Sequence, residues 1–222
     1  MWHEGRLFES TGLYGASAIY EKKLQTGDAI NQRALHPRLF GEGLAVHDAR
    51  LWQLTWREGM GLVYDLDLTP RARFALRTEG WGLTGDGTRL WMTDGSATLH
   101  ELDPDTGDVI GRVLVRKDGH PVTRLNELEW INGLIFANRY RSDEVVIIRP
   151  DDGVVIGSLD LSDLRTHFDP PPGFSATEDV LNGIAWRADT EELLVTGKRW
   201  PRLFVLRLHW PPSVHEAPDP GQ

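Results

Sequence analysis

A recurring segment constrains the fold of this chain more than any other feature of its sequence. In the unit that starts at Phe40, Gly-Leu opens a short apolar strand, residues 47–50 form a polar turn, and a second strand follows over 51–56. The second strand is rich in aromatic and aliphatic residues, as β-strands are. The same order of events returns around three later positions, Trp81, Asn126 and Asn182. The chain is therefore predicted to build one small structural unit several times.

The second strands of the units align on a central apolar residue, which is Phe8, Trp52, Trp91, Phe136 and Val195 in turn. Successive separations are 44, 39, 45 and 59 residues. Periods near forty residues with several short strands and glycine turns are typical of β-propeller blades, whose small sheets need neighbours to bury their faces. We predict an all-β, five-bladed β-propeller in which Trp52, Trp91 and Phe136 pack equivalently between blades. Helical periodicity is scarce, and residues 161–168 are expected to form one or two turns in an inserted loop before Pro170.

Both ends of the chain lack part of this pattern. Counting back from Phe8 places the first Gly-Leu at or ahead of Met1, so we expect the first blade to have lost the beginning of its innermost strand. A misassigned start or a truncated relative would explain this. Only one strand, over 203–208, follows Val195, and the last blade is expected to be one strand short. We predict a single propeller domain over residues 1–208 and a disordered, Pro-rich tail over 209–222.

Composition excludes several classes of function. The net charge is −9, from 24 Lys and Arg against 33 Asp and Glu, and no basic cluster is long enough to follow a nucleic-acid backbone. No run approaches the roughly twenty apolar residues of a membrane span, and residues 1–5 do not resemble a secretory signal. The absence of Cys excludes disulfides, thiolate catalysis and Cys-ligated zinc, and leaves the compartment open. We expect a monomer that binds neither nucleic acid nor membrane.

The repeat also indicates which residues lie together. The innermost strand of a blade lines the central channel, so residues at its start are expected to converge on one mouth of the channel: Glu42, Trp81, Asn126 and Asn182. Four residues past each reference position come Trp56, Gly95, Tyr140 and Arg199, with Lys198 beside the last. This set holds a carboxylate, an ammonium group, carboxamides and large aromatics, without a metal-ligand pattern. It suits a small polar ligand with an apolar stem, and proton transfer without a metal.

Seven motifs carry a family resemblance: Phe40-Gly-Glu-Gly-Leu44, Gln53-Leu-Thr-Trp56, Glu79-Gly-Trp-Gly-Leu83, Thr93-Asp-Gly-Ser96, Arg124-Leu-Asn-Glu-Leu128, Leu181-Asn-Gly-Ile184 and Thr196-Gly-Lys-Arg-Trp-Pro201. Together they resemble, over about residues 6 to 208, the plant and bacterial type of glutaminyl-peptide cyclotransferase, a five-bladed propeller. The resemblance implies conversion of the N-terminal glutamine of peptides or proteins to pyroglutamate with release of ammonia. It also implies no zinc and no cofactor, and a secreted or periplasmic location if the true start lies upstream.

The resemblance assigns a role to six residues. Glu42 resembles the acid/base carboxylate, Asn126 a hydrogen-bonding partner of the reacting amide, and Lys198 a positive group near developing charge. The aromatic walls of the pocket correspond to Trp56, Trp81 and Tyr140. Two departures are visible: Tyr140 stands where the family usually has Trp, and the family's opening Phe-Thr-Gln-Gly-Leu is absent.

Simpler interpretations stand beside these roles. Glu42, between two glycines, has the pattern of a solvated turn carboxylate, Trp56 and Trp81 that of packing residues, and Lys198 that of a surface charge. Asn126 has the pattern of a residue that ends an inner-strand turn, and we expect Asn182 to be structural. The turn from Asp94 to Ser96 contains a hydroxyl, but no His is expected to serve it.

Three functions are compatible with this sequence. The first is cyclisation of N-terminal glutamine. The second is an inactive pseudoenzyme of the same fold, lacking the missing segment. The third is a non-catalytic propeller whose loops bind a protein or sugar partner.

Overall fold

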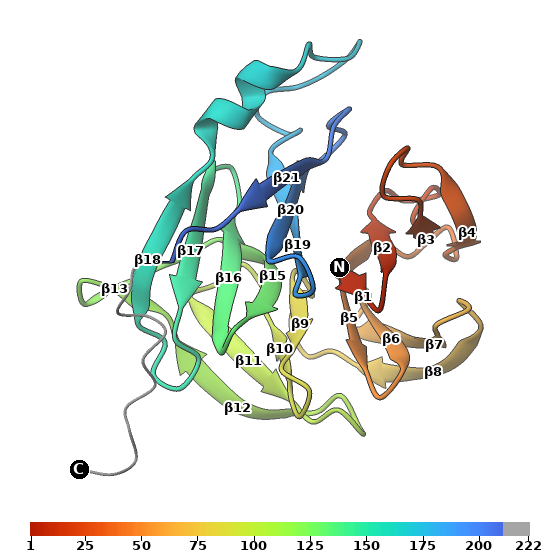
Figure 1. The fold of residues 1–222 in the computed structure, drawn as a ribbon. Helices are drawn as coiled ribbons and strands as arrows, with labels where there is room; N and C mark the ends of the chain where they lie inside the picture. Colours follow the sequence, from red (N-terminus) through yellow and green to blue (C-terminus); the bar gives the residue numbers. More distant parts are fainter. Residues whose placement is uncertain (211–222) are drawn as a thin grey trace.

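The computed structural model describes residues 1–210 and shows five small antiparallel sheets arranged as a five-bladed β-propeller (Figure 1). Within each sheet the strands follow one another in chain order. The strands of the first two blades are β1 Trp2–His3, β2 Arg6–Thr11, β3 Ala18–Lys22 and β4 Ala29–Ala34, then β5 Gly41–His47, β6 Arg50–Thr55, β7 Met60–Asp65 and β8 Pro70–Ala75.

The remaining blades follow the same order. Their strands are β9 Leu83–Gly85, β10 Leu90–Met92, β11 Thr98–Leu102 and β12 Val109–Leu114, then β15 Leu125–Ile131, β16 Leu134–Arg139, β17 Glu144–Ile148 and β18 Val155–Asp160, and finally β19 Leu181–Arg187, β20 Glu192–Gly197 and β21 Phe204–Arg207. A separate hairpin, β13 Arg116–Lys117 and β14 His120–Pro121, lies between the third and fourth blades in the chain.

Two-residue turns join the inner strand to the second strand in three blades. Their central residues, Glu4–Gly5, Asp48–Ala49 and Asn132–Gly133, all have positive φ, between 46° and 84°. Positive φ at both positions defines the turn whose twist matches that of the flanking strands. The backbone conformation of these turns therefore suits the twist of the hairpins that they close.

Each pair of neighbouring blades buries its own apolar cluster around one residue of a second strand. Phe8 lies in the cluster between blades one and two, Trp52 between two and three, Trp91 between three and four, and Phe136 between four and five. The predicted equivalence of Trp52, Trp91 and Phe136 is confirmed. Each of these rings packs with buried residues of two neighbouring sheets, so the blades stabilise one another.

The fifth reference residue was predicted one position too late. In the second blade Trp52 pairs with Ala45 of the inner strand, and in the fourth blade Phe136 pairs with Glu129. The equivalent inner-strand residue of the fifth blade is Ala185, and its partner is Leu194. Leu194 packs in the cluster between blades five and one, whereas Val195 faces blade four. The run Leu193-Leu194-Val195 contains no aromatic residue that would mark the register. The correction places Lys198, and not Arg199, four residues past the reference position.

The first and last blades differ from the others, as expected. The last sheet has three strands within the described residues, and the inner strand β1 has two residues where β5, β15 and β19 have seven. The ring is closed by packing between these blades, through buried Leu7, Ala185 and Leu194, with the Arg187 guanidinium 4.9 Å from the Trp2 ring centre. Strands β1 and β19 of the two blades are in contact (Figure 1). This closing cluster has the fewest buried residues of the five.

The expected short helix is present as a 3-10 helix, η1 Ser162–His167. Leu164 and Phe168 are buried in the cluster between blades four and five, so the inserted segment is packed against the ring. In the described part of the chain no helix is long and apolar enough to cross a membrane. The predicted tail, 209–222, lies outside the described residues except for its first two. Of these, Trp210 packs against Phe136, with ring centroids 5.9 Å apart.

The closing cluster generates a stability prediction. Leu194→Ala truncates the most deeply buried side chain between blades one and five and should lower the free energy of unfolding by about 2–5 kcal/mol, the usual cost of such a cavity. Ile30→Ala, at an exposed position of β4, is the matched control and should change it by less than about 0.5 kcal/mol. Chemical denaturation monitored by circular dichroism gives both values. Equal stability of the two variants would show that this contact does not hold the ring closed.

Candidate active site

A repeated β-bulge sets the direction of the residues at the channel mouth. In β5, β15 and β19 the pairing shifts at one place, so that two inner-strand residues oppose one residue of the second strand. These pairs are Glu42–Gly43, Asn126–Glu127 and Asn182–Gly183. In the third blade Trp81 and Gly82 likewise both bond to the backbone of Thr93, at 2.9 and 3.0 Å. A bulge re-aims a side chain relative to the regular pleat, and here it does so at equivalent sites in four blades.

Close packing of the inner strands locks these bulges together. Gly43 N donates to Trp81 O at 2.7 Å, and a Cβ added to Gly82 would collide with the Asn126 carbonyl oxygen. Buried Thr93 Oγ1 accepts from Gly82 N and donates to Asn126 O, both at 2.8 Å. The backbones that carry Glu42, Trp81 and Asn126 are therefore fixed relative to one another.

The aromatic residues form a continuous set across the mouth. The Trp56 and Trp81 indoles donate through Nε1 to the same oxygen, Glu79 Oε2, at 2.8 and 2.9 Å. The Trp81 and Tyr140 rings meet edge to face with centroids 5.6 Å apart, and Lys198 Nζ lies 5.1 Å from the centre of the Tyr140 ring. Side chains from blades two, three, four and five thus line one site.

The Glu42 carboxyl has a strongly raised pKa. Glu42 keeps part of its surface open toward the channel, but burial raises the pKa of its carboxyl to about 8. The Lys198 ammonium opposes this rise, and the Glu58 and Glu79 carboxylates add to it. A group with this pKa exchanges protons readily near neutral pH.

Two further carboxyls of the inner strand β15 were not singled out in the sequence. Burial raises the pKa of Glu127 to about 8 and that of Glu129 to about 7. Glu129 Oε1 accepts a hydrogen bond from Trp186 N of the fifth blade at 2.9 Å. Glu129 lies between apolar Leu128 and Trp130, as a solvent-facing strand residue would, and Glu127 follows the polar Asn126, so neither stood out. One signal was available, because Glu127 stands where the inner strands of three other blades have glycine.

The sequence assigned no role to several other residues of the site. Glu79 was quoted only as part of a motif, yet it holds two indoles. The Arg57 guanidinium lies 3.7 Å from the centre of the Trp56 ring, and Phe40 packs against the other side of the site, 5.5 Å from Trp56. Charged residues in turns between strands carry no periodic signal, so nothing local marked them.

Three residues of the predicted set contribute no side-chain contact with these aromatic rings in the described structure. Arg199 is exposed and pairs with Asp179 at 3.5 Å, away from the aromatic set. Gly95 presses on the Trp81 ring and offers no side chain. Asn182 occupies the fifth-blade bulge, and its Oδ1 is buried with no hydrogen-bond partner in the described structure.

The expectation that no His serves the Asp94–Ser96 turn is wrong for Asp94. His100 Nε2 lies 3.0 Å from Asp94 Oδ2, because the pairing of β10 with β11 brings the two together. Ser96 Oγ instead accepts from Thr98 N at 3.1 Å. The turn therefore holds an Asp–His pair without a hydroxyl nucleophile on it.

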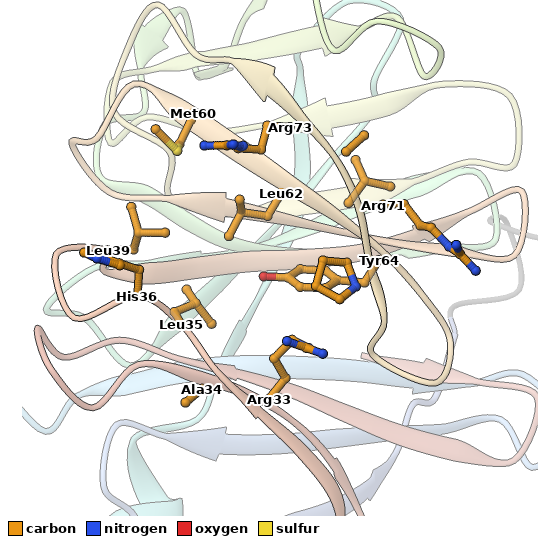
Figure 2. Close-up of a pocket in the computed structure, with 13 residues that line it drawn as sticks. Arg33, Ala34, Leu35, His36, Leu39, Met60, Leu62, Tyr64, Arg71 and Arg73 are labelled. Atoms are coloured by element: carbon orange, nitrogen blue, oxygen red, sulfur yellow. The ribbon is translucent and has the colours of Figure 1, made fainter.

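A cavity of about 430 Å³ lies elsewhere, between β4, β7 and β8 of the first two blades. Figure 2 shows Arg33, Leu62, Tyr64 and Arg73 around it. None of the six residues that carry the predicted roles lines this cavity. Over residues 1–210, no three His, Cys, Asp or Glu side chains are grouped so that they could hold a metal ion.

The raised pKa of the half-buried Glu127 carboxyl generates a prediction about pH. Because the folded-state pKa of Glu127 is raised from 4.5 to about 8, its contribution to stability is complete below about pH 4.5 and is lost as the pH rises through about 8. Glu127→Gln should therefore raise the melting temperature at pH 9 and change it little at pH 5. Exposed Glu191→Gln is the control. Melting curves with the same difference at both pH values would contradict the raised pKa.

Comparison with known proteins now identifies the family. The family model described as glutamine cyclotransferase matches residues 1–208. The chain is 42% identical over 204 residues to a glutaminyl-peptide cyclotransferase of Arabidopsis thaliana, covering 91% of this chain and 63% of that relative's length. It superimposes on the crystal structure of Myxococcus xanthus glutaminyl cyclase with a TM-score of 0.85 and 36% identity, covering 92% of this chain and 87% of the other. This chain belongs to the glutamine cyclotransferase family.

Proposed function

We propose that this protein is a glutaminyl-peptide cyclotransferase, which converts the N-terminal glutamine of peptides or proteins to pyroglutamate and releases ammonia. One observation carries the proposal. A carboxyl with a pKa of about 8, Glu42, lies at a mouth lined by Trp56, Trp81 and Tyr140, with a single ammonium group, Lys198, acting on it. A peptide α-amine titrates at about 7.7 to 8.0, so proton transfer between the two is nearly balanced.

The proposed mechanism begins with proton transfer. The Glu42 carboxylate takes a proton from the substrate α-ammonium, and the free amine attacks the γ-carbonyl carbon, forming the ring C–N bond. Glu42 then returns its proton to the amide nitrogen, whose bond to carbon breaks as ammonia leaves. The proton that the ring nitrogen gives up passes to Glu42. The reactive complex therefore carries one proton that is shared between the substrate α-amine and the Glu42 carboxyl. Activity falls at lower pH, where both groups are protonated, and at higher pH, where neither is.

The other residues act by position and charge. The aromatic walls fold the apolar stem of glutamine so that the amine meets its own γ-carbonyl, which is the main requirement of an intramolecular reaction. Lys198 stabilises negative charge on the carbonyl oxygen, and Asn126 hydrogen-bonds the reacting amide. We further propose that residues 1–208 act as one domain and as a monomer. The proposed reaction uses no metal, because protein groups supply both the proton carrier and the positive charge.

Removal of the proton carrier tests the activity. Glu42→Gln should lower kcat at least about a hundredfold, the usual scale of general acid/base catalysis, while circular dichroism shows an unchanged fold. The assay measures ammonia release from a glutaminyl dipeptide, with a chelating agent present to test metal independence. Exposed Glu191→Gln should match the wild type. A wild-type protein that binds the dipeptide without releasing ammonia would instead support a non-catalytic propeller.

Lys198 generates a prediction about the pH profile. Its charge lowers the pKa of Glu42, so Lys198→Met should raise that pKa and move the acidic limb of the kcat/KM profile to higher pH. Arg199→Met, at the adjacent exposed cation, should leave the limb in place. If Arg199→Met moved the acidic limb and Lys198→Met did not, Arg199 would be the cation near Glu42, as the register counted from Val195 predicts.

A further inference from the structure

Glu79 joins two walls of the candidate pocket that come from different blades. It lies in the connection from β8 to β9, two residues before Trp81, whereas Trp56 follows the end of β6. One of its oxygens, Oε2, accepts both indole N–H groups, at 2.8 and 2.9 Å. The other, Oε1, accepts from Arg57 Nε at 2.9 Å. The hydrogen bonds that the Glu79 carboxylate accepts in the described structure come from Trp56, Trp81 and Arg57.

This geometry restricts the two rings strongly. An indole has one donor, and the bond from it fixes the rotation of the ring about its side-chain axis. Two indoles that share one acceptor oxygen are fixed relative to each other as well. A charged acceptor makes stronger bonds than a neutral one. Arg57 adds a second constraint, since its guanidinium both bonds Glu79 and lies 3.7 Å from the centre of the Trp56 ring.

We propose that Glu79 is a positioning residue that sets the separation and tilt of Trp56 and Trp81, and through them the fit of the glutaminyl side chain. The inference rests on the proposed function. It assigns Glu79 no contact with the reacting atoms. Its effect is on substrate binding and on the fraction of bound substrate that is correctly folded.

The charge of Glu79 has a separate effect. The groups that act on the Glu42 carboxyl are Lys198, which lowers its pKa, and Glu58 and Glu79, which raise it; Glu127 also faces Glu42. Loss of the Glu79 charge should therefore lower the pKa of Glu42. Glu58 offers a matched comparison, because it carries the same charge but bonds Tyr14 Oη at 2.7 Å and Phe40 N at 3.3 Å, and neither indole.

Three variants of the full chain separate position from charge. Glu79→Gln removes the charge and weakens the shared acceptor, Glu79→Asp keeps the charge but shortens the reach, and Glu58→Gln removes a charge while leaving the indoles bonded. The first readout is the position of the Trp56 and Trp81 indole Nε1–H signals in ¹H–¹⁵N spectra, assigned with Trp56→Phe and Trp81→Phe. The second is KM, kcat and the pH profile for a glutaminyl dipeptide.

The expected results differ for each variant. Glu79→Gln should shift both indole signals, raise KM about tenfold, the worth of one charged hydrogen bond, and move the acidic limb to lower pH. Glu79→Asp should shift both signals and raise KM while the limb stays in place. Glu58→Gln should move the limb and leave both signals and KM unchanged.

Two outcomes would overturn the proposal. Indole signals that stay in place in both Glu79 variants would show that the carboxylate does not hold the rings. An equal rise in KM in Glu58→Gln and Glu79→Gln would show that charge, and not position, is what matters. The spectra need no turnover, so a wild type without cyclase activity would contradict the proposed function and still leave the test of Glu79 intact.

Discussion

The close approach of neighbouring inner strands is the constraint on which the site depends. At Gly82 no side chain fits, because the Asn126 carbonyl of the next blade occupies the space, and Thr93 bonds both strands from behind. Contacts of this kind fix the backbones of the bulges in neighbouring strands, and Glu42, Trp81 and Asn126 occupy equivalent positions in these bulges. Blade packing thereby fixes residues far apart in sequence without a dedicated catalytic loop.

The same packing explains the unusual acids. Burial of carboxyls between closely packed inner strands favours their neutral form. Glu42, Glu127 and Glu129 share this environment, and each has a raised pKa. Such groups cost stability as the pH rises, yet they supply a proton carrier matched to an α-amine. The raised pKa values therefore lower the free energy of unfolding at high pH and allow proton transfer near neutral pH.

The aromatic side chains of the candidate site are held by contacts between blades. Trp56, Trp81 and Tyr140 come from three blades, and none is held by its own strand alone. Glu79 links the first two, and an edge-to-face contact links Trp81 to Tyr140, beside which Lys198 lies. For a reaction that joins two ends of one side chain, placement of that side chain contributes more than strong chemical groups do. The contacts among the walls are therefore part of the proposed catalytic design.

The sequence by itself determined the fold class, the blade number and the packing roles of Trp52, Trp91 and Phe136, because a repeat puts the same local signal at each blade. It also pointed to the four inner-strand positions at the mouth. Only the tertiary structure decided that Leu194 is the fifth reference residue, since the pairing of two apolar strands has no local marker. This register gives Lys198, to which the family resemblance had already assigned a role, the same position in its blade as Trp56 and Tyr140 have in theirs. The hydrogen bonds from two indoles to Glu79 had no marker in the sequence, and the raised pKa of Glu127 had only the replacement of an inner-strand glycine as a signal. Hydrogen bonds between blades and exclusion of water arise from contacts distant in sequence, and these exist only once the ring is assembled.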